Sequence, residues 1–225
     1  MNASLFTHQS LTYLVRYPEG FDAARKYPTL MFLHGAGTRG SDTTLLLENP
    51  FFSCIENYRE FPFVVIAPQC WADTWVEVWE QLKTLTSAAA ALPFVDEDRF
   101  YCMGASMGGY GTWQLAISMP EHFAAIVPIC GGGMYWNASR LMHVPVWAFH
   151  GGKDPVISPE ESRKMTDAVN RSGGSAKLTI YPENDHNAWS DTYSNPEVFQ
   201  WLLAHKKEHS RSVPPAHLGN PEIYG

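Results

Sequence analysis

The chain has 225 residues, of which 45% are hydrophobic and 17% are charged, and its formal net charge is −7. This composition is typical of a soluble globular protein with one sizeable core. The basic residues form no long run, which argues against binding to nucleic acid or to an anionic membrane surface.

The N-terminal residues and the apolar runs bear on where the protein is expected to act. Residues 1–10 lack the basic and apolar regions of a signal peptide, and no apolar stretch is long enough to cross a bilayer. We therefore expect a cytoplasmic protein. Residues 207–225 are polar and contain Pro214-Pro215. This composition predicts an extended or disordered tail after a single domain over residues 1–206.

Short apolar runs alternate with longer stretches of helical periodicity along the chain. This pattern predicts an α/β fold, with a mostly parallel twisted sheet and helices on both faces. Uninterrupted apolar runs such as residues 63–67 are typical of strands that are buried on both faces. The predicted strands cover residues 11–17, 29–33, 63–67, 99–103, 125–129, 146–149 and 177–181.

Helices are predicted between these strands. Apolar residues recur near the 3.6-residue period from Trp75 to Leu92, and residues 109–117 form a further plausible helix. Ser158-Pro159-Glu160-Glu161 has the form of a capping box, and that helix should end near Gly173-Gly174. Asn195-Pro196-Glu197 starts the last helix in the same way. No insertion is long enough for a large lid domain.

The segment Gly104-Ala105-Ser106-Met107-Gly108 follows the predicted strand at residues 99–103. It has the G-x-S-x-G form of a nucleophile elbow, a sharp strand-to-helix turn that exposes a serine hydroxyl. Small residues must flank this serine, because the backbone passes close to it on both sides. Ser106 is therefore the predicted nucleophile. The alternative is a glycine-rich turn with an incidental serine.

A serine hydroxyl needs a base to take its proton, and the base needs an acid to hold its tautomer. In this type of fold the chain order is serine, acid, histidine. Asp154 and His186 follow predicted strands in that order, and we predict them as acid and base. Glu183 and Asp185 are rival acids, although Asp185 adjoins the histidine too closely to orient its ring. The alternatives are a turn role for Asp154 and a surface role for His186.

An acyl-transfer reaction also needs two backbone N–H groups that bind the developing oxyanion. One should belong to Met107, directly after the serine. The other should come from the loop His34-Gly35-Ala36-Gly37, with Ala36 as first choice and Gly37 as second. His34 itself more naturally braces this loop. The alternative is a simple glycine turn after a strand.

The eight tryptophans are candidates for a substrate pocket. Four of them lie in segments that follow predicted strands, namely Trp71, Trp75, Trp136 and Trp189. Core packing is an equally good interpretation of these four. An aromatic pocket would favour short acyl or aryl esters. The four cysteines lack the spacing of a metal site, and the predicted chemistry needs neither a metal nor an organic cofactor.

These motifs together resemble those of the α/β-hydrolases, in particular the small esterase group. That group includes carboxylesterase/phospholipase-like proteins, dienelactone-hydrolase-like proteins and the "predicted peptidase" relatives of prolyl oligopeptidase. The matching segments are Leu33-His34-Gly35-Ala36-Gly37, Ala67-Pro68-Gln69-Cys70, Gly104 to Gly111, His150-Gly151-Gly152-Lys153-Asp154 and His186-Asn187-Ala188-Trp189. The resemblance implies the α/β-hydrolase fold and serine-hydrolase chemistry.

Two departures from the family are informative. Dienelactone hydrolases proper are expected to carry a cysteine at the elbow, where this chain has Ser106. The chain also lacks the propeller domain of the prolyl oligopeptidases, which weakens a peptidase role. The expected function is hydrolysis of small-molecule carboxylic esters through an acyl-enzyme on Ser106. The alternatives are a serine peptidase for small peptides and a non-catalytic binding protein. The natural substrate and the oligomeric state stay open.

Overall fold

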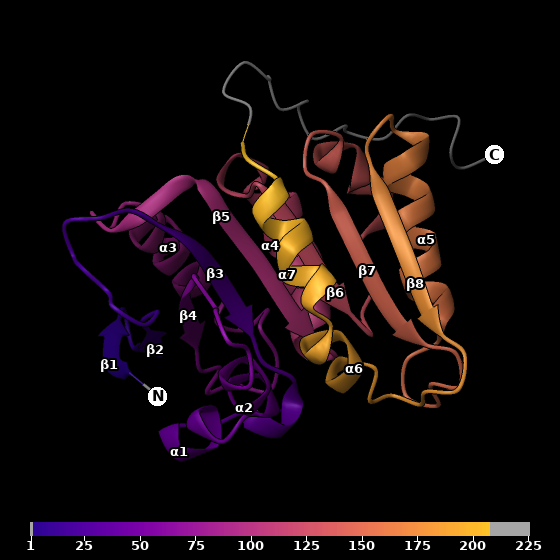
Figure 1. The fold of residues 1–225 in the computed structure, drawn as a ribbon. Coiled ribbons are helices and arrows are strands. Elements are labelled where there is room, and N and C mark those ends of the chain that lie inside the picture. The colour runs from indigo at the N-terminus through magenta and orange to yellow at the C-terminus, as the bar shows by residue number, and fades with distance from the viewer. Residues whose placement is uncertain (1, 208–225) are drawn as a thin grey trace.

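An eight-stranded sheet runs through the molecule, with helices on both of its faces (Figure 1). The computed structural model describes residues 2–207. The strands are β1 (Ala3–His8), β2 (Leu11–Arg16), β3 (Tyr27–Leu33), β4 (Val64–Pro68), β5 (Val95–Ala105), β6 (Ala125–Ile129), β7 (Val146–Gly151) and β8 (Ala176–Tyr181). The helices are α1 (Thr43–Leu47), α2 (Pro50–Glu56), α3 (Trp79–Ala90), α4 (Met107–Ser118), α5 (Pro159–Arg171), α6 (Trp189–Ser194) and α7 (Pro196–Ala204), with 3-10 helices η1 (Ala36–Thr38), η2 (Pro120–His122) and η3 (Tyr135–Leu141).

The order of strands across the sheet is β1-β2-β4-β3-β5-β6-β7-β8. β2 runs antiparallel to β1 and β4. The other strands, β3 to β8, are mutually parallel. Every residue of β4, β6 and β7 is buried, as uninterrupted apolar runs predict. The carboxyl ends of the parallel strands meet at one edge of the sheet, the lower edge in Figure 1.

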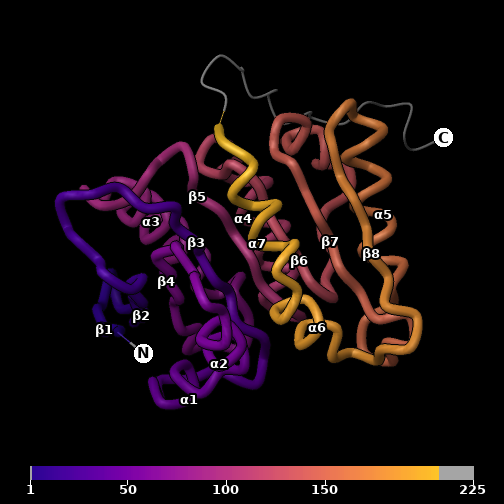
Figure 2. The backbone as a smooth tube through the Cα atoms, in the orientation of Figure 1, coloured from indigo at the N-terminus to yellow at the C-terminus, as the bar shows by residue number. Residues whose placement is uncertain are grey.

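Two hydrophobic cores lie on the two faces of this sheet. α3, α4 and α5 contribute Leu82, Leu115 and Met165 to one core, and α2 and α7 contribute Phe51 and Phe199 to the other. In Figures 1 and 2, α7 passes in front of the sheet and α4 lies behind it. The predicted mostly parallel sheet between helical layers is confirmed. Within residues 2–207, the connections between strands form no separate lid domain.

All seven predicted strands are present, with ends that differ by a few residues. The sequence pattern missed β1, which pairs with β2 through a turn at Gln9 and Ser10. These two residues have φ values of 45° and 67°. Tight hairpin turns favour such values, but the residues that usually adopt them are Gly and Asn. β1 is also exposed along most of its length, so it lacks a clear apolar face.

The predicted start of a helix at Trp75 is wrong, because α3 begins at Trp79. Residues 75–78 form a turn instead. Trp75 is only 2% exposed, and its Nε1 donates a hydrogen bond to the carbonyl of His34 at 3.1 Å. The backbone N–H of Thr74 donates to Glu77 Oε1 at 2.9 Å. The buried contacts of Trp75 therefore outweigh the helical periodicity of the sequence at this position.

The two helices predicted to start with a capping side chain and a proline do so in the structure. Ser158 Oγ accepts from the N–H of Glu160 at the start of α5, and Gly173 follows that helix with φ 82°. Asn195 caps α7 through the N–H of Glu197. The short helices α1, α2 and α6, of five, seven and six residues, were missed because they span too few turns to show a period. The Asn49-Pro50 pair could have revealed α2, because it repeats the Asn-Pro start of α7.

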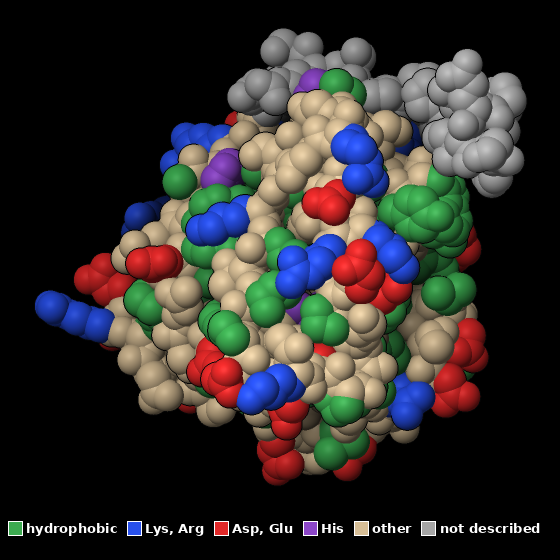
Figure 3. All heavy atoms as spheres, turned by 90° about the vertical axis from the view of Figure 1, so that its right-hand side faces the viewer, with side chains coloured by type: hydrophobic (Ala, Val, Ile, Leu, Met, Phe, Trp, Pro, Cys, Tyr) green, Lys and Arg blue, Asp and Glu red, His purple; other side chains and the backbone are tan. Residues whose placement is uncertain are grey.

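The surface carries charges of both signs. Figure 3 shows the side formed by α5 and β8, where acidic and basic side chains are scattered rather than gathered by sign. Within residues 2–207, no helix combines the length and apolar character needed to cross a membrane. Residues 208–225 lie outside the described part of the chain, so the predicted tail and the domain boundary at residue 206 stay predictions.

Candidate active site

Ser106 lies at the apex of a sharp turn between β5 and α4. Its φ and ψ are 57° and −118°, an unfavourable conformation for a residue with a side chain. Such backbone strain is concentrated at functional sites. A Cβ at Gly108 would lie 1.9 Å from the carbonyl oxygen of Leu33, and one at Gly104 would lie 2.4 Å from the carbonyl oxygen of Gly108. The turn therefore requires glycine at both positions of the G-x-S-x-G motif.

The structure brings Ser106, His186 and Asp154 together in one hydrogen-bonded chain. His186 Nε2 is 2.9 Å from Ser106 Oγ, and His186 Nδ1 is 2.7 Å from Asp154 Oδ2. The three residues follow β5, β8 and β7, whose carboxyl ends share one edge of the sheet. This is the geometry in which a histidine can take a proton from a serine while a carboxylate holds its tautomer.

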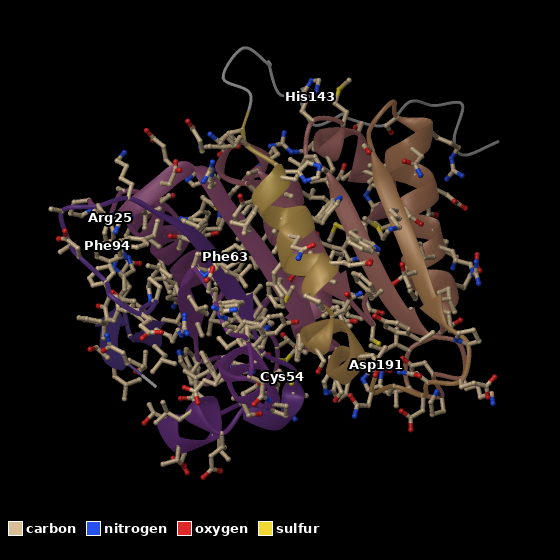
Figure 4. All side chains as sticks on the ribbon, viewed as in Figure 1. Arg25, Cys54, Phe63, Phe94, His143 and Asp191 are labelled. Carbon is tan, nitrogen blue, oxygen red and sulfur yellow. The ribbon has the colours of Figure 1, made fainter. Side chains whose placement is uncertain are left out.

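The rival acids lie elsewhere. The exposed carboxylate of Glu183 pairs with Lys153, and Asp185 Oδ1 accepts the N–H of Asn187 at 2.9 Å. The His186 ring, by contrast, contacts Asp154. Figure 4 shows Asp191 of α6 at the lower edge, near these loops, and His143 at the opposite end of the molecule.

Asp154 is held as a carboxylate by several donors. Its side chain is fully buried, and Oδ1 accepts the N–H groups of Val156 at 2.8 Å and Ile157 at 3.0 Å. Burial alone would raise the pKa of Asp154. The hydrogen bonds from His186, Ile157 and Val156 outweigh this effect and hold that pKa below its ordinary value. Asp154 is therefore ionised at neutral pH and can stabilise a protonated His186.

The predicted oxyanion donors are backbone N–H groups on two segments near the serine. Met107 is the first residue of α4, so its N–H has no partner within the helix. The loop after β3 is close by, because a Cβ at Gly35 would lie 3.6 Å from Ser106 Cβ. In the described part of the chain, the N–H groups of Met107, Ala36 and Gly37 donate no hydrogen bond. The choice between Ala36 and Gly37 stays a prediction.

His34 ties this loop to the end of the neighbouring strand. Its Nδ1 donates to the carbonyl of Gly35 at 2.7 Å, and its Nε2 accepts the N–H of Cys70 at 2.9 Å. A ring with one donor and one acceptor nitrogen is neutral. Burial lowers the pKa of His34 to about 4, so the brace persists at neutral pH.

We expect this buried histidine to make folding stability sensitive to acid. An unfolded histidine binds a proton near pH 6.5, whereas folded His34 binds one near pH 4, so the unfolded state is favoured as pH falls through this window. The full effect is about 3 kcal/mol. Urea unfolding of the native protein and of His34→Gln at several pH values checks this. The native protein should lose more stability between pH 6.5 and 4, and equal slopes would contradict the assignment.

Two cavities lie beside the elbow. One, of about 460 Å³, is lined by Ser106, His186, the loop from Gly35 to Thr38, Asn49, Pro50, Ala105, Val156, Trp189 and Tyr193. We name it the serine cavity. The other, of about 420 Å³, is lined by Thr74, Trp75, Val76, Trp79, Met107, Tyr110, Gly111, Gln114 and Gly132 to Met134. We name it the apolar cavity, because Trp75, Val76, Trp79 and two methionines line it.

The four candidate pocket tryptophans are distributed differently. Trp189 lines the serine cavity, and its ring meets His186 edge to face with centroids 5.2 Å apart. Trp75 lines the apolar cavity. Trp71 and Trp136 are 50% and 54% exposed, and they are not among the lining residues of either cavity. A role for them in substrate binding stays a prediction.

A second cluster of titratable groups lies beneath the serine cavity. Cys130, His150 and Asp154 have potential metal-ligand atoms within 4.8 Å of one another. Both ring nitrogens of His150 and both oxygens of Asp154 already contact protein groups. Cys130 Sγ donates to the carbonyl of His186 at 3.3 Å. We therefore interpret this cluster as hydrogen-bonding support for Asp154 and not as a metal centre.

Comparison with known proteins identifies the family. The sequence profile of the dienelactone hydrolase family matches residues 63–201, more than half of the chain. The chain belongs to the dienelactone hydrolase family. Relatives of this family member include a "Probable feruloyl esterase C" of Aspergillus terreus, 24% identical over 79% of this chain and 67% of that protein. They also include a dipeptidyl-peptidase 5 of Porphyromonas gingivalis, 24% identical over 78% of this chain.

Solved structures agree with the family assignment. The crystal structure of a thermostable esterase is 31% identical, has a TM-score of 0.76, and is matched over 91% of this chain and 63% of that one. Est1E of Butyrivibrio proteoclasticus, at 15% identity and a TM-score of 0.67, shares the fold over its whole length. This family member spans only 32% of the P. gingivalis peptidase. The family and its esterase neighbours support a hydrolase on the α/β-hydrolase fold.

Proposed function

We propose that this protein is a serine hydrolase that cleaves carboxylic esters through an acyl-enzyme on Ser106. The observation that carries the proposal is the chain of hydrogen bonds from Ser106 through His186 to the ionised Asp154, at the mouth of a cavity. In this mechanism Ser106 Oγ attacks the ester carbonyl while His186 Nε2 takes its proton. The N–H groups of Met107 and Ala36 bind the oxyanion.

The remaining steps of acylation and deacylation use the same groups. Protonated His186 gives its proton to the leaving alkoxide, and the alcohol departs. His186 then takes a proton from water, whose oxygen attacks the acyl carbon. The tetrahedral intermediate then breaks its bond to Ser106 Oγ and releases the carboxylic acid, and Ser106 takes its proton back from His186. Asp154 stays ionised throughout and stabilises the protonated ring.

The positions of the two cavities suggest how an ester would bind. The alkoxide must leave beside His186, which lines the serine cavity, so the alcohol part belongs there. The acyl chain then extends to the other side of the oxyanion donors, toward the apolar cavity bounded by Met107. Burying an apolar acyl or aryl group there is favourable, at about 25 cal/mol per Å². We therefore propose apolar acyl esters, aryl esters included, as the substrate class.

The main alternative is a peptidase, as the dipeptidyl-peptidase relatives suggest. An enzyme that removes dipeptides must recognise a free α-ammonium group, and buried recognition of a cation requires a carboxylate partner. Among the described residues that line the two cavities, none is Asp or Glu. This observation favours an ester over a dipeptide substrate.

The test is hydrolysis of p-nitrophenyl esters from acetate to octanoate, beside dipeptide p-nitroanilides. We expect ester turnover that depends on Ser106 and little or no peptide turnover. Faster release from the anilides would favour the peptidase, and binding without turnover of either series would favour a binding protein.

Gln114 offers a direct test of the apolar cavity, because it lies half-buried on α4 and lines that cavity. We expect Gln114→Trp to fill the cavity and to lower kcat/KM for octanoate relative to acetate by about 10-fold or more. Gln114→Ala is the matched control and should leave or raise that ratio. If Trp189→Ala alters the acyl preference and Gln114→Trp does not, the acyl chain binds in the serine cavity instead.

A further inference from the structure

A second histidine contacts the carboxylate of the triad. His150 lies in β7, four residues before Asp154, and its side chain is fully buried. Its Nε2 is 3.2 Å from Asp154 Oδ2. The same oxygen accepts from His186 Nδ1 at 2.7 Å. Asp154 Oδ2 is therefore shared by two imidazole rings.

The surroundings of His150 fix where its proton lies. Besides Asp154 Oδ2, Nε2 faces the carbonyl oxygen of Ile157 at 2.9 Å. Both neighbours are acceptors, so Nε2 must carry a hydrogen to avoid a repulsive contact. On the other side of the ring, Nδ1 is 2.8 Å from Ser162 Oγ and accepts its hydrogen when the ring is neutral; the same Oγ also lies 2.8 Å from the carbonyl oxygen of Gly131. The ring is thus held by Ser162 of α5 and by Ile157 in the loop after β7.

We propose that His150 is a positioning residue for the triad, which donates from Nε2 to Asp154 Oδ2 and fixes the plane of that carboxylate. The backbone N–H groups of Val156 and Ile157 hold only Oδ1. Oδ2 faces His186 Nδ1 at 2.7 Å and His150 Nε2 at 3.2 Å, and the thiol of Cys130 also lies close to the Asp154 carboxylate. Without His150, the carboxylate is free to turn about the Oδ1 contacts and to lose its alignment with His186. The inference rests on the proposed ester hydrolysis.

Asp154 is the main source of charge around His150. The titratable groups that face it are Asp154, His186 and Cys130. Burial raises the pKa of Cys130 to about 12, so its thiol is neutral. Burial also lowers the pKa of His150, against the opposing effects of Ile157 O and Asp154. The Nε2–H donor stabilises the negative charge on Asp154 and thereby moderates the pull of Asp154 on a protonated His186.

The native protein provides the first test, which needs no variant. Two-dimensional ¹⁵N NMR of histidine-labelled protein distinguishes nitrogens that carry a proton from those that do not. We expect Nε2 of His150 to carry a proton that exchanges slowly with water. An unprotonated Nε2 would overturn the proposal, whatever the enzyme's activity proves to be.

Two substitutions distinguish a positioning role of His150 from a packing role. Gln places an amide nitrogen near the Nε2 position of the histidine, whereas Asn places one near the Nδ1 position. We expect His150→Gln to keep most of kcat, whereas His150→Asn, which retains only the Ser162 side, loses on the order of 10²-fold in kcat with little change in KM. Equal losses in both variants, or a loss that appears in KM rather than in kcat, would overturn the proposal.

The experiments distinguish a failure of the proposed function from a failure of the His150 proposal. If ester turnover by the native protein does not depend on Ser106, the hydrolase mechanism is wrong, and the NMR experiment still decides the protonation of His150. If Ser106 is essential and the two His150 variants behave alike, the mechanism stands and His150 is a packing residue. Thermal unfolding of both variants shows whether a loss of kcat arises from a loss of fold.

Discussion

Replacing Ser106 with alanine is expected to lower kcat for ester hydrolysis by about 10⁶-fold. The alanine side chain has no oxygen to attack the carbonyl. His186 Nε2, which lies 2.9 Å from Ser106 Oγ in the native protein, then has no serine proton to take. The remaining turnover should come from binding and from the oxyanion donors, which stay in place. The measurement is single-turnover and steady-state hydrolysis of a p-nitrophenyl ester.

A matched control is available on the same helix. Ser118 ends α4 and its hydroxyl contacts only Gln114 Nε2, at 3.4 Å, among the described groups. Ser118→Ala should therefore keep native kcat. Ser106→Ala should unfold at nearly the native temperature, because it removes one hydrogen bond to a half-buried ring. If Ser106→Ala retains native kcat, the nucleophile is not Ser106.

Asp154→Asn is expected to lower kcat by about 10⁴-fold. The N–H groups of Val156 and Ile157 donate to the Oδ1 position, so the asparagine oxygen must lie there. Its NH₂ group then faces Nδ1 of His186, which can only accept. His186 must place its single proton on Nε2, toward Ser106, and so loses the lone pair that makes it a base. The fold stays intact while the tautomer is wrong.

The rival acids supply the control for this prediction. Glu183→Gln and Asp185→Asn should each keep kcat close to the native value, because both carboxylates lie on the surface and neither contacts the His186 ring. The pH dependence of kcat/KM should be preserved in both. Native activity in Asp154→Asn together with a large loss in Glu183→Gln would transfer the acid role to Glu183.

The sequence predicts the parts of the fold that follow from local patterns. Uninterrupted apolar runs gave the buried strands, and Pro-containing caps gave the starts of α5 and α7. The order of Ser106, Asp154 and His186 along the chain placed them on loops at one sheet edge, and the structure joins them by hydrogen bonds. Such residues are predictable because the topology of a parallel sheet fixes which loops converge.

Sequence patterns did not predict the features that depend on tertiary packing. Trp75 looked like the start of a helix, but it is buried against the backbone of His34 in a turn. Trp71 and Trp136 follow strands as Trp189 does, yet only Trp189 lines the serine cavity. The contact of His150 with Asp154 depends on how the chain turns after β7, which residue spacing does not encode.

The central claim is that ester hydrolysis proceeds through an acyl group on Ser106. The most direct measurement is mass spectrometry of the protein quenched in acid during turnover of a p-nitrophenyl ester, followed by peptide mapping. The account predicts an acyl adduct on the peptide that contains Ser106, formed in the initial burst and absent from Ser106→Ala. Ester turnover at the native rate by Ser106→Ala, with no adduct on the native protein, would contradict it.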